Sequence, residues 1–230
     1  MHHKEVHLHS SDAIKDIVIG MSDGLTVPFA LAAGLSSAID SSTIIVIAGT
    51  AEIAAGSIAM GLGGFLAGKT EVDYYLSELK REYTEVEEFP EIEKDEVKEV
   101  FANLGLPGHL QNKIANEIAK DKNKWVDFMM RYELDLTKPH ANRATQSAIA
   151  IGLSYVIGGI IPLLPYFFIK NSREALYYSC GITLICLFIL GYFKSKKTGR
   201  PPLAGALNVV FIGALAASAA FFIAKLINSH

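Results

Sequence analysis

Five apolar runs of 19 to 26 residues, three of them without any acidic or basic residue, constrain the fold of this 230-residue chain most strongly. A helix needs about 20 apolar residues to cross the hydrocarbon core of a bilayer. Soluble helices normally keep a polar face, which these runs lack. We therefore predict an all-α integral membrane protein with five transmembrane helices. The runs are Ile17–Ile39, Thr43–Gly68, Ala144–Ile169, Ala175–Phe193 and Pro201–Ala224.

A polar, acidic stretch separates the second run from the third. Between Glu71 and Lys138 the chain has 17 acidic and 10 basic residues, a net charge of −7, whereas the whole chain has a net charge of −3. Apolar residues recur there at spacings of three and four, which is typical of helices. Pro90 and the turn at 105–108 divide the stretch. We predict three helices, the first continuous with the second membrane helix, at Lys69–Phe89, Glu91–Leu104 and His109–Leu136.

These patterns divide the chain into three parts. Residues 1–68 hold a leader and two membrane helices, residues 69–140 form the acidic helical domain, and residues 141–230 hold three membrane helices. Basic residues near short loops set orientation, and they gather on the side of the leader and the acidic domain. We therefore expect this side and the N-terminus to be cytosolic, with the C-terminus on the opposite side. The basic residues are Lys4, Lys15, Lys69, Lys138, Arg143, Lys194, Lys196, Lys197 and Arg200.

Histidines crowd the leader, and glycines crowd the membrane segments. The histidine-rich composition resembles a metal tract, but we expect a tag remnant or a solvated tail at His2, His3, His7 and His9. Small residues let helices approach closely in lipid. The glycine pattern fits packing within one bundle and a dimer interface equally well.

Two carboxylates interrupt the first two apolar runs. Asp23 lies in the first and Glu52 in the second, and neither run contains a basic residue of its own. An acidic side chain at bilayer depth costs roughly 2.5–3.5 kcal/mol on insertion scales and usually faces a bundle interior or an ion path. Met60 follows Glu52 by eight positions, about 80° around a helix, so the two share a broad face. Carboxylates with a thioether suit a borderline ion such as Fe²⁺.

The acidic domain offers a second candidate metal site. Glu78, Glu82 and Glu85 share one face of its first predicted helix, and Glu93 and Glu96 are three apart on its second. Acidic runs on helices are usually solvated surface, but carboxylates from several helices can also converge on a metal. The third predicted helix adds the group Met129, Met130 and Glu133.

Two long motifs resemble the vacuolar iron transporter family, with plant members the most similar. The first runs from Asp23 to Leu35 (DGLTVPFALAAGL) and the second from Ala51 to Gly61 (AEIAAGSIAMG). The resemblance covers nearly the whole chain, including the acidic insert after the second crossing.

Membership of that family would imply a homodimer in the vacuolar membrane that exports Fe²⁺ from the cytosol in exchange for protons. It would also imply some tolerance for Mn²⁺, Co²⁺ and Zn²⁺. The family's translocation residues map onto Asp23, Glu52 and Met60. Its cytosolic metal-binding residues map onto Glu82, Glu85, Glu93, Glu96, Met129, Met130 and Glu133.

Three other classes of protein compete with a transporter. A di-metal oxidase such as a ferroxidase usually carries a Glu-x-x-His motif. The histidines in or beside the insert, His109 and His140, lack a glutamate three positions earlier, so we expect no enzymatic activity. A scaffold for a basic partner would leave Asp23 and Glu52 without a role. A metal-gated channel is an alternative that the sequence does not exclude. We expect metal ions, protons, lipid and a second copy as partners, and no nucleic acid.

Overall fold

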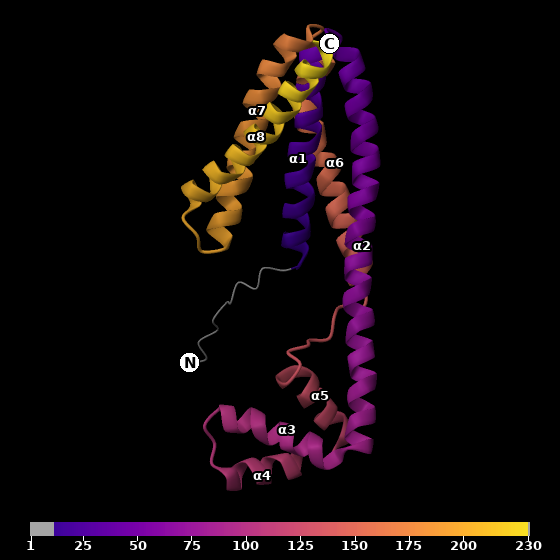
Figure 1. Ribbon diagram of the computed structural model, residues 1–230, viewed down its shortest axis with the longest axis vertical. Coiled ribbons are helices and arrows are strands. Elements are labelled where there is room, and N and C mark those ends of the chain that lie inside the picture. The colour runs from indigo at the N-terminus through magenta and orange to yellow at the C-terminus, as the bar shows by residue number, and fades with distance from the viewer. Residues whose placement is uncertain (1–11, 230) are drawn as a thin grey trace, which may run out of the picture. The chain divides into compact units, whose positions relative to one another are not determined.

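The computed structural model describes residues 12–229, which form eight helices (Figure 1). Within these residues, five helices are long and apolar enough to cross a membrane, and three short helices lie between the second and third of them. The predicted fold class is therefore confirmed. The histidines of the leader lie outside the described residues. The long helices are α1 (Asp12–Ala38), α2 (Ser42–Glu88), α6 (Arg143–Phe168), α7 (Ser172–Lys197) and α8 (Pro202–Asn228).

The chain folds as two compact units that share one helix. The first, here called the membrane unit, holds α1, the apolar part of α2, and α6 to α8; the second, here called the insert unit, comprises Ala67–Arg143. As predicted, α2 is uninterrupted: its apolar part ends at Gly68 and its polar extension reaches Glu88. The short helices of the insert unit are α3 (Pro90–Asn103), α4 (Gly108–Ile118) and α5 (Lys122–Tyr132).

Glycines bring α1 and α6 into backbone contact within the membrane unit. A Cβ atom added at Gly20 or Gly24 of α1 would collide with the backbone of Ile151 or Tyr155 of α6. In the other direction, a Cβ at Gly158 would lie 2.9 Å from the carbonyl oxygen of Met21. These glycines therefore serve close helix packing inside one bundle, which is one of the two roles that the sequence left open.

Two loops at one end of the membrane unit are tied together by side chains. Ser42 Oγ donates to the carbonyl oxygen of Lys170 at 3.0 Å, and Ser172 Oγ donates to the carbonyl oxygen of Ile39 at 2.8 Å. The α1–α2 connection is thereby fixed to the α6–α7 connection. At this end Figure 1 shows α1, α7 and α8 close together, and at the other end α7 and α8 lean away from α1.

The core of the insert unit is built from the extension of α2 and from α3, α4 and α5. Val97, Val126 and Met129 are completely buried in it, and Trp125 is nearly so. Tyr83 on the extension of α2 donates its hydroxyl to Asn123 Oδ1 at 2.8 Å, which fixes the start of α5. The polar extension of α2 is thus an integral part of the insert unit.

The prediction of one helix over His109–Leu136 is wrong, because the chain breaks between α4 and α5. Asp121 has an extended backbone (φ −125°, ψ 105°) and accepts hydrogen bonds from the backbone N–H groups of Asn123 and Lys124 at 3.1 and 3.3 Å. An aspartate in this position caps a helix N-terminus, so α5 begins anew there. It ends at Tyr132, which leaves Glu133 as its C-cap.

Candidate functional site

Glu52, the acidic side chain of the second membrane helix, is held by a tyrosine from α6. Tyr155 is 2% exposed and donates its hydroxyl to Glu52 Oε1. The other carboxylate oxygen, Oε2, is buried and has no hydrogen-bond partner within the described residues. A buried oxygen without a partner is costly to keep, and it is free to accept a cation or a proton.

Glycines make room for this tyrosine. A Cβ at Gly56, one turn after Glu52, would lie 2.6 Å from Cζ of Tyr155 and 2.7 Å from its Cε1. A Cβ at Gly24 of α1 would lie 2.9 Å from Cα of Tyr155. Tyr155 therefore fills the space between α1 and α2 because neither facing residue has a side chain.

Asp23 precedes Gly24 on α1 and approaches the same tyrosine. It is half-buried, and its carboxylate is near enough to Tyr155 for an electrostatic interaction. The buried Pro28 lies further along α1, which continues through it as a helix. Asp23 and Glu52, predicted from the sequence as separate acids, are thus related through Tyr155.

Met60 lies on α2 two turns after Glu52 and one turn after Gly56, and it is half-buried.

Tyr155 was not predicted from the sequence as a functional residue. The available signal was a hydroxyl inside the uncharged run Ala144–Ile169, where a polar group needs a partner. Asp23, Glu52 and Tyr155 combine carboxylate and phenol chemistry on three helices, which suits a divalent ion or a proton.

In the insert unit, four of the predicted glutamates surround one pocket of about 280 Å³. Glu93 and Glu96 come from α3, and Phe89 and Ile92 add apolar walls. Glu85 extends from α2, and Glu133 from the end of α5. The predicted convergence of carboxylates from several helices therefore occurs for these four residues.

Arg81 also lines this pocket and was not predicted. Its guanidinium lies 2.9 Å from Glu78, 3.3 Å from Glu85 and 4.0 Å from Glu82. The spacings of three and four along α2 could have predicted the first two ion pairs. Arg81 is a built-in cation among the acids, and a metal ion entering the pocket would compete with it.

Burial and mutual repulsion raise the pKa of several glutamates at and beside this pocket. Burial, reinforced by the carboxylates of Glu96 and Glu82, raises the pKa of Glu93 to about 8. Burial and then the charges of Glu133 and Glu85 raise the pKa of Glu82 to about 7, against the opposing effect of Arg81. Burial first and neighbouring carboxylates second also raise the pKa of Glu96 and of Glu133.

The remaining predicted ligands, Glu82, Met129 and Met130, are buried and do not line this pocket. Met129 and Met130 are buried in the core of the insert unit, and the pocket wall contains neither of them. Glu82 is 1% exposed, and its Oε2, like Oε2 of Glu93, has no hydrogen-bond partner among the described side chains. In the described part of the chain, no three His, Cys, Asp or Glu side chains are arranged so that they could hold a metal ion. Binding a metal here therefore requires side chains to move.

Comparison with known proteins places this architecture in a family. The family model described as the VIT family matches residues 14–225. The chain is 51% identical to vacuolar iron transporter 1 of Arabidopsis thaliana, over 99% of this chain and 91% of that protein. It is 48% identical to vacuolar iron transporter 1 of Tulipa gesneriana, over 99% of this chain and 92% of that protein. With Protein CCC1 of Saccharomyces cerevisiae it shares 38% identity, over 94% of this chain and 69% of that protein. The chain therefore belongs to the VIT family.

Proposed function

We propose that this chain is a proton-coupled transporter that moves Fe²⁺ from the cytosol into the vacuole. Relatives that match nearly all of it are named vacuolar iron transporters. The structural observation that carries the proposal is Glu52, whose Oε1 accepts from Tyr155 while its buried Oε2 has no hydrogen-bond partner among the described residues. An ionisable group kept in a membrane helix at such cost is a marker of an ion path.

Asp23, Glu52 and Met60 form the translocation path in this proposal. Tyr155 positions the Glu52 carboxylate and leaves one oxygen of it for the ion. Two carboxylates in a medium of low dielectric constant cannot both stay ionised cheaply. Fe²⁺ and protons therefore compete for the same oxygens, and protons arriving from an acidic vacuole release the metal on that side.

The insert unit captures the metal before transport. Glu85, Glu93, Glu96 and Glu133 already share a pocket, and the buried Glu82 lies close enough to interact with their charges. Entry of Fe²⁺ displaces Arg81 and the protons on the glutamates. Met129 and Met130 lie on α5, whose C-cap is Glu133, so a small rotation of its last turn is the rearrangement that would bring a thioether to the ion.

The remaining parts of the proposal concern assembly, orientation and metal choice. The basic loops support a cytosolic N-terminus and insert unit and a lumenal C-terminus. We propose a homodimer, and transport of Mn²⁺, Co²⁺ and Zn²⁺ beside Fe²⁺. A ferroxidase is disfavoured because His109 and His140, the histidines in or next to the insert along the sequence, are both exposed and do not line the glutamate pocket.

Uptake into vesicles tests the proposed function. The full chain, reconstituted in liposomes with an acidic interior, is expected to accumulate Fe²⁺ under anaerobic conditions and to alkalinise the interior at the same time. Both signals should vanish when an ionophore collapses the pH gradient. Fe²⁺ entry that is equally fast without a gradient and moves no protons would identify a channel and contradict antiport.

Metal binding to the insert unit should strengthen as the pH rises from 5 to 8. The pKa values of Glu82 and Glu93, about 7 and 8, lie above their ordinary value of 4.5. The contribution of these two protonated side chains to the stability of the metal-free unit is thus fully present below about pH 4.5, and it is lost progressively as the pH rises from there through about 7 and 8. A metal must displace these protons, so its affinity should rise about tenfold per pH unit for each proton displaced.

The single tryptophan of the chain, Trp125, lies in the core of the insert unit and reports on this binding in the full-length protein. Its fluorescence during anaerobic Fe²⁺ titration gives the affinity at each pH. Glu93→Gln should flatten the pH dependence and weaken binding. Glu117→Gln on α4, an exposed acid paired with Lys120, is the matched control. A pH-independent affinity in the unmodified protein would exclude proton competition at this pocket.

A further inference from the structure

A groove between α1 and α7 in the membrane unit has no role in the metal path. It has a volume of about 530 Å³, within the range of small-molecule sites. It lies where α1 begins and α7 ends, the end at which α7 leans away from α1 in Figure 1. Asp23, Glu52 and the insert pocket are not among its lining residues.

The walls of this groove are apolar. Ile14 and Ile19 of α1 are 38% and 46% exposed, and Phe193 of α7 is 59% exposed. Val18 and Leu190 complete the apolar surface. Such a surface fits a hydrocarbon chain and offers nothing to a free inorganic anion.

Three lysines rim the groove. Lys194 and Lys197 are three positions apart on the last turn of α7 and therefore lie on one face of it. Lys15 approaches from α1 and is paired with Asp12 at 3.1 Å. Among the described residues, Lys194 and Lys197 have no ion pair, so the rim carries an excess of positive charge.

We propose that this groove binds one anionic phospholipid, with the phosphate at the lysines and an acyl chain along the apolar walls. A neutral lipid would leave the lysines without a counter-ion, and a free anion would leave the walls exposed. Basic pockets between membrane helices on the cytosolic side recognise anionic headgroups in this way. The choice of leaflet rests on the orientation proposed above; the binding itself does not.

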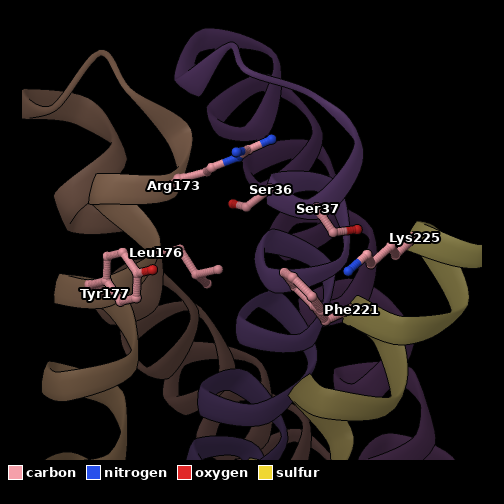
Figure 2. A pocket seen from close by; sticks show the side chains of 7 residues that line it. All are labelled: Ser36, Ser37, Arg173, Leu176, Tyr177, Phe221 and Lys225. Carbon is pink, nitrogen blue, oxygen red and sulfur yellow. The ribbon is translucent and has the colours of Figure 1, made fainter. Parts of the chain in front are cut away.

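A second pocket at the opposite end of the membrane unit provides a matched control. It has a volume of about 340 Å³ and lies among α1, α7 and α8. Figure 2 shows Arg173 and Lys225 entering it from opposite sides, with Ser37 near the lysine. Arg173 already faces Asp40 at 3.8 Å. Two positive charges can therefore be removed here without touching the groove.

Lipid titration of the purified full chain, followed by native mass spectrometry, tests the proposal without iron or a pH gradient. The probes are dioleoyl phosphatidylinositol 4-phosphate, dioleoyl phosphatidylcholine and the same phosphorylated headgroup without acyl chains. We expect one tightly bound anionic lipid. Binding of phosphatidylcholine and of the chain-free headgroup should each be weaker by about tenfold or more.

The double variant Lys194→Gln, Lys197→Gln should weaken binding of the anionic lipid by about tenfold or more, since each lysine contributes to headgroup attraction. Val18→Trp, which fills the groove and keeps the charge, should weaken it as well. Arg173→Gln, Lys225→Gln should leave it unchanged. Equal losses in both double variants would overturn the proposal in favour of non-specific charge attraction.

Two other outcomes would also overturn it. Undiminished binding of the chain-free headgroup would identify an anion site instead of a lipid site. A change of oligomeric state in the lysine variant, with lipid binding intact, would identify the groove as a contact between copies. Size-exclusion chromatography and thermal unfolding of each variant establish that any loss of binding is not a loss of folding.

Discussion

Glu52→Gln is expected to reduce proton-driven Fe²⁺ uptake to the background of empty liposomes. The amide still accepts a hydrogen bond from Tyr155, so the packing of α2 on α6 is retained. It cannot carry the negative charge that balances the ion, and it cannot exchange a proton. Removing one partner of a buried charge pair costs about 3–5 kcal/mol, which corresponds to a loss of about 100-fold or more in rate.

Asp40→Asn is the matched control for this variant. Asp40 is also acidic and precedes α2, but its side chain is 88% exposed and its ion pair with Arg173 is long. Exposed pairs of this kind contribute little, so uptake should stay within about twofold of the unmodified protein. Uptake by Glu52→Gln at the unmodified rate, in protein with a normal unfolding temperature, would remove Glu52 from the path.

Gly24→Ala is expected to destabilise the membrane unit and to reduce transport together. The new Cβ would lie 2.9 Å from both Cα and the carbonyl carbon of Tyr155, and closer still to its carbonyl oxygen. These are backbone atoms, so α1 and α6 must separate, and Tyr155 moves away from Glu52. Overpacking of this kind costs about 1–3 kcal/mol, which should lower the unfolding temperature by roughly 3–10 °C.

The two cysteines of the chain make this measurement specific to the membrane unit. Cys180 and Cys186 both lie on α7 and are half-buried, so a thiol-reactive dye reports on unfolding there. Gly63→Ala is the control, because no atom lies within 4 Å of the Cβ position at Gly63. It should be neutral or slightly stabilising, since alanine favours a helix over glycine. Equal unfolding temperatures for both variants would show that the contact of α1 with α6 is not tight.

The candidate residues of the membrane unit could be predicted from the sequence, but their arrangement could not. Asp23 and Glu52 stand out because acids are rare in apolar runs of membrane-spanning length. Their common neighbour Tyr155 is 103 positions from Glu52, and no local spacing predicts that contact. It follows from Gly24 and Gly56, whose lack of side chains lets a tyrosine from α6 reach between α1 and α2.

In the insert unit, the sequence predicted most of the pocket residues but missed one helix break and one basic residue. Helical spacings indicated Glu85, Glu93 and Glu96, and Glu133 entered with the two methionines of the third predicted helix; these four glutamates do surround a pocket. The break at Asp121 was missed because apolar periodicity in α4 and α5 continues across it, while a single capping side chain decides the backbone. Arg81 was missed although its spacing to Glu78 and Glu85 is visible in the chain.

The sequence by itself determined five membrane-spanning helices, the acidic helical insert and the two intramembrane acids. These features depend on the local cost of placing each segment in lipid or water, which composition and periodicity express. Only the tertiary structure decided that Tyr155 holds Glu52, that Met129 and Met130 are buried in a core, and that three lysines rim an apolar groove. Each of these depends on which helix faces meet, and that is decided by packing between residues far apart in the chain.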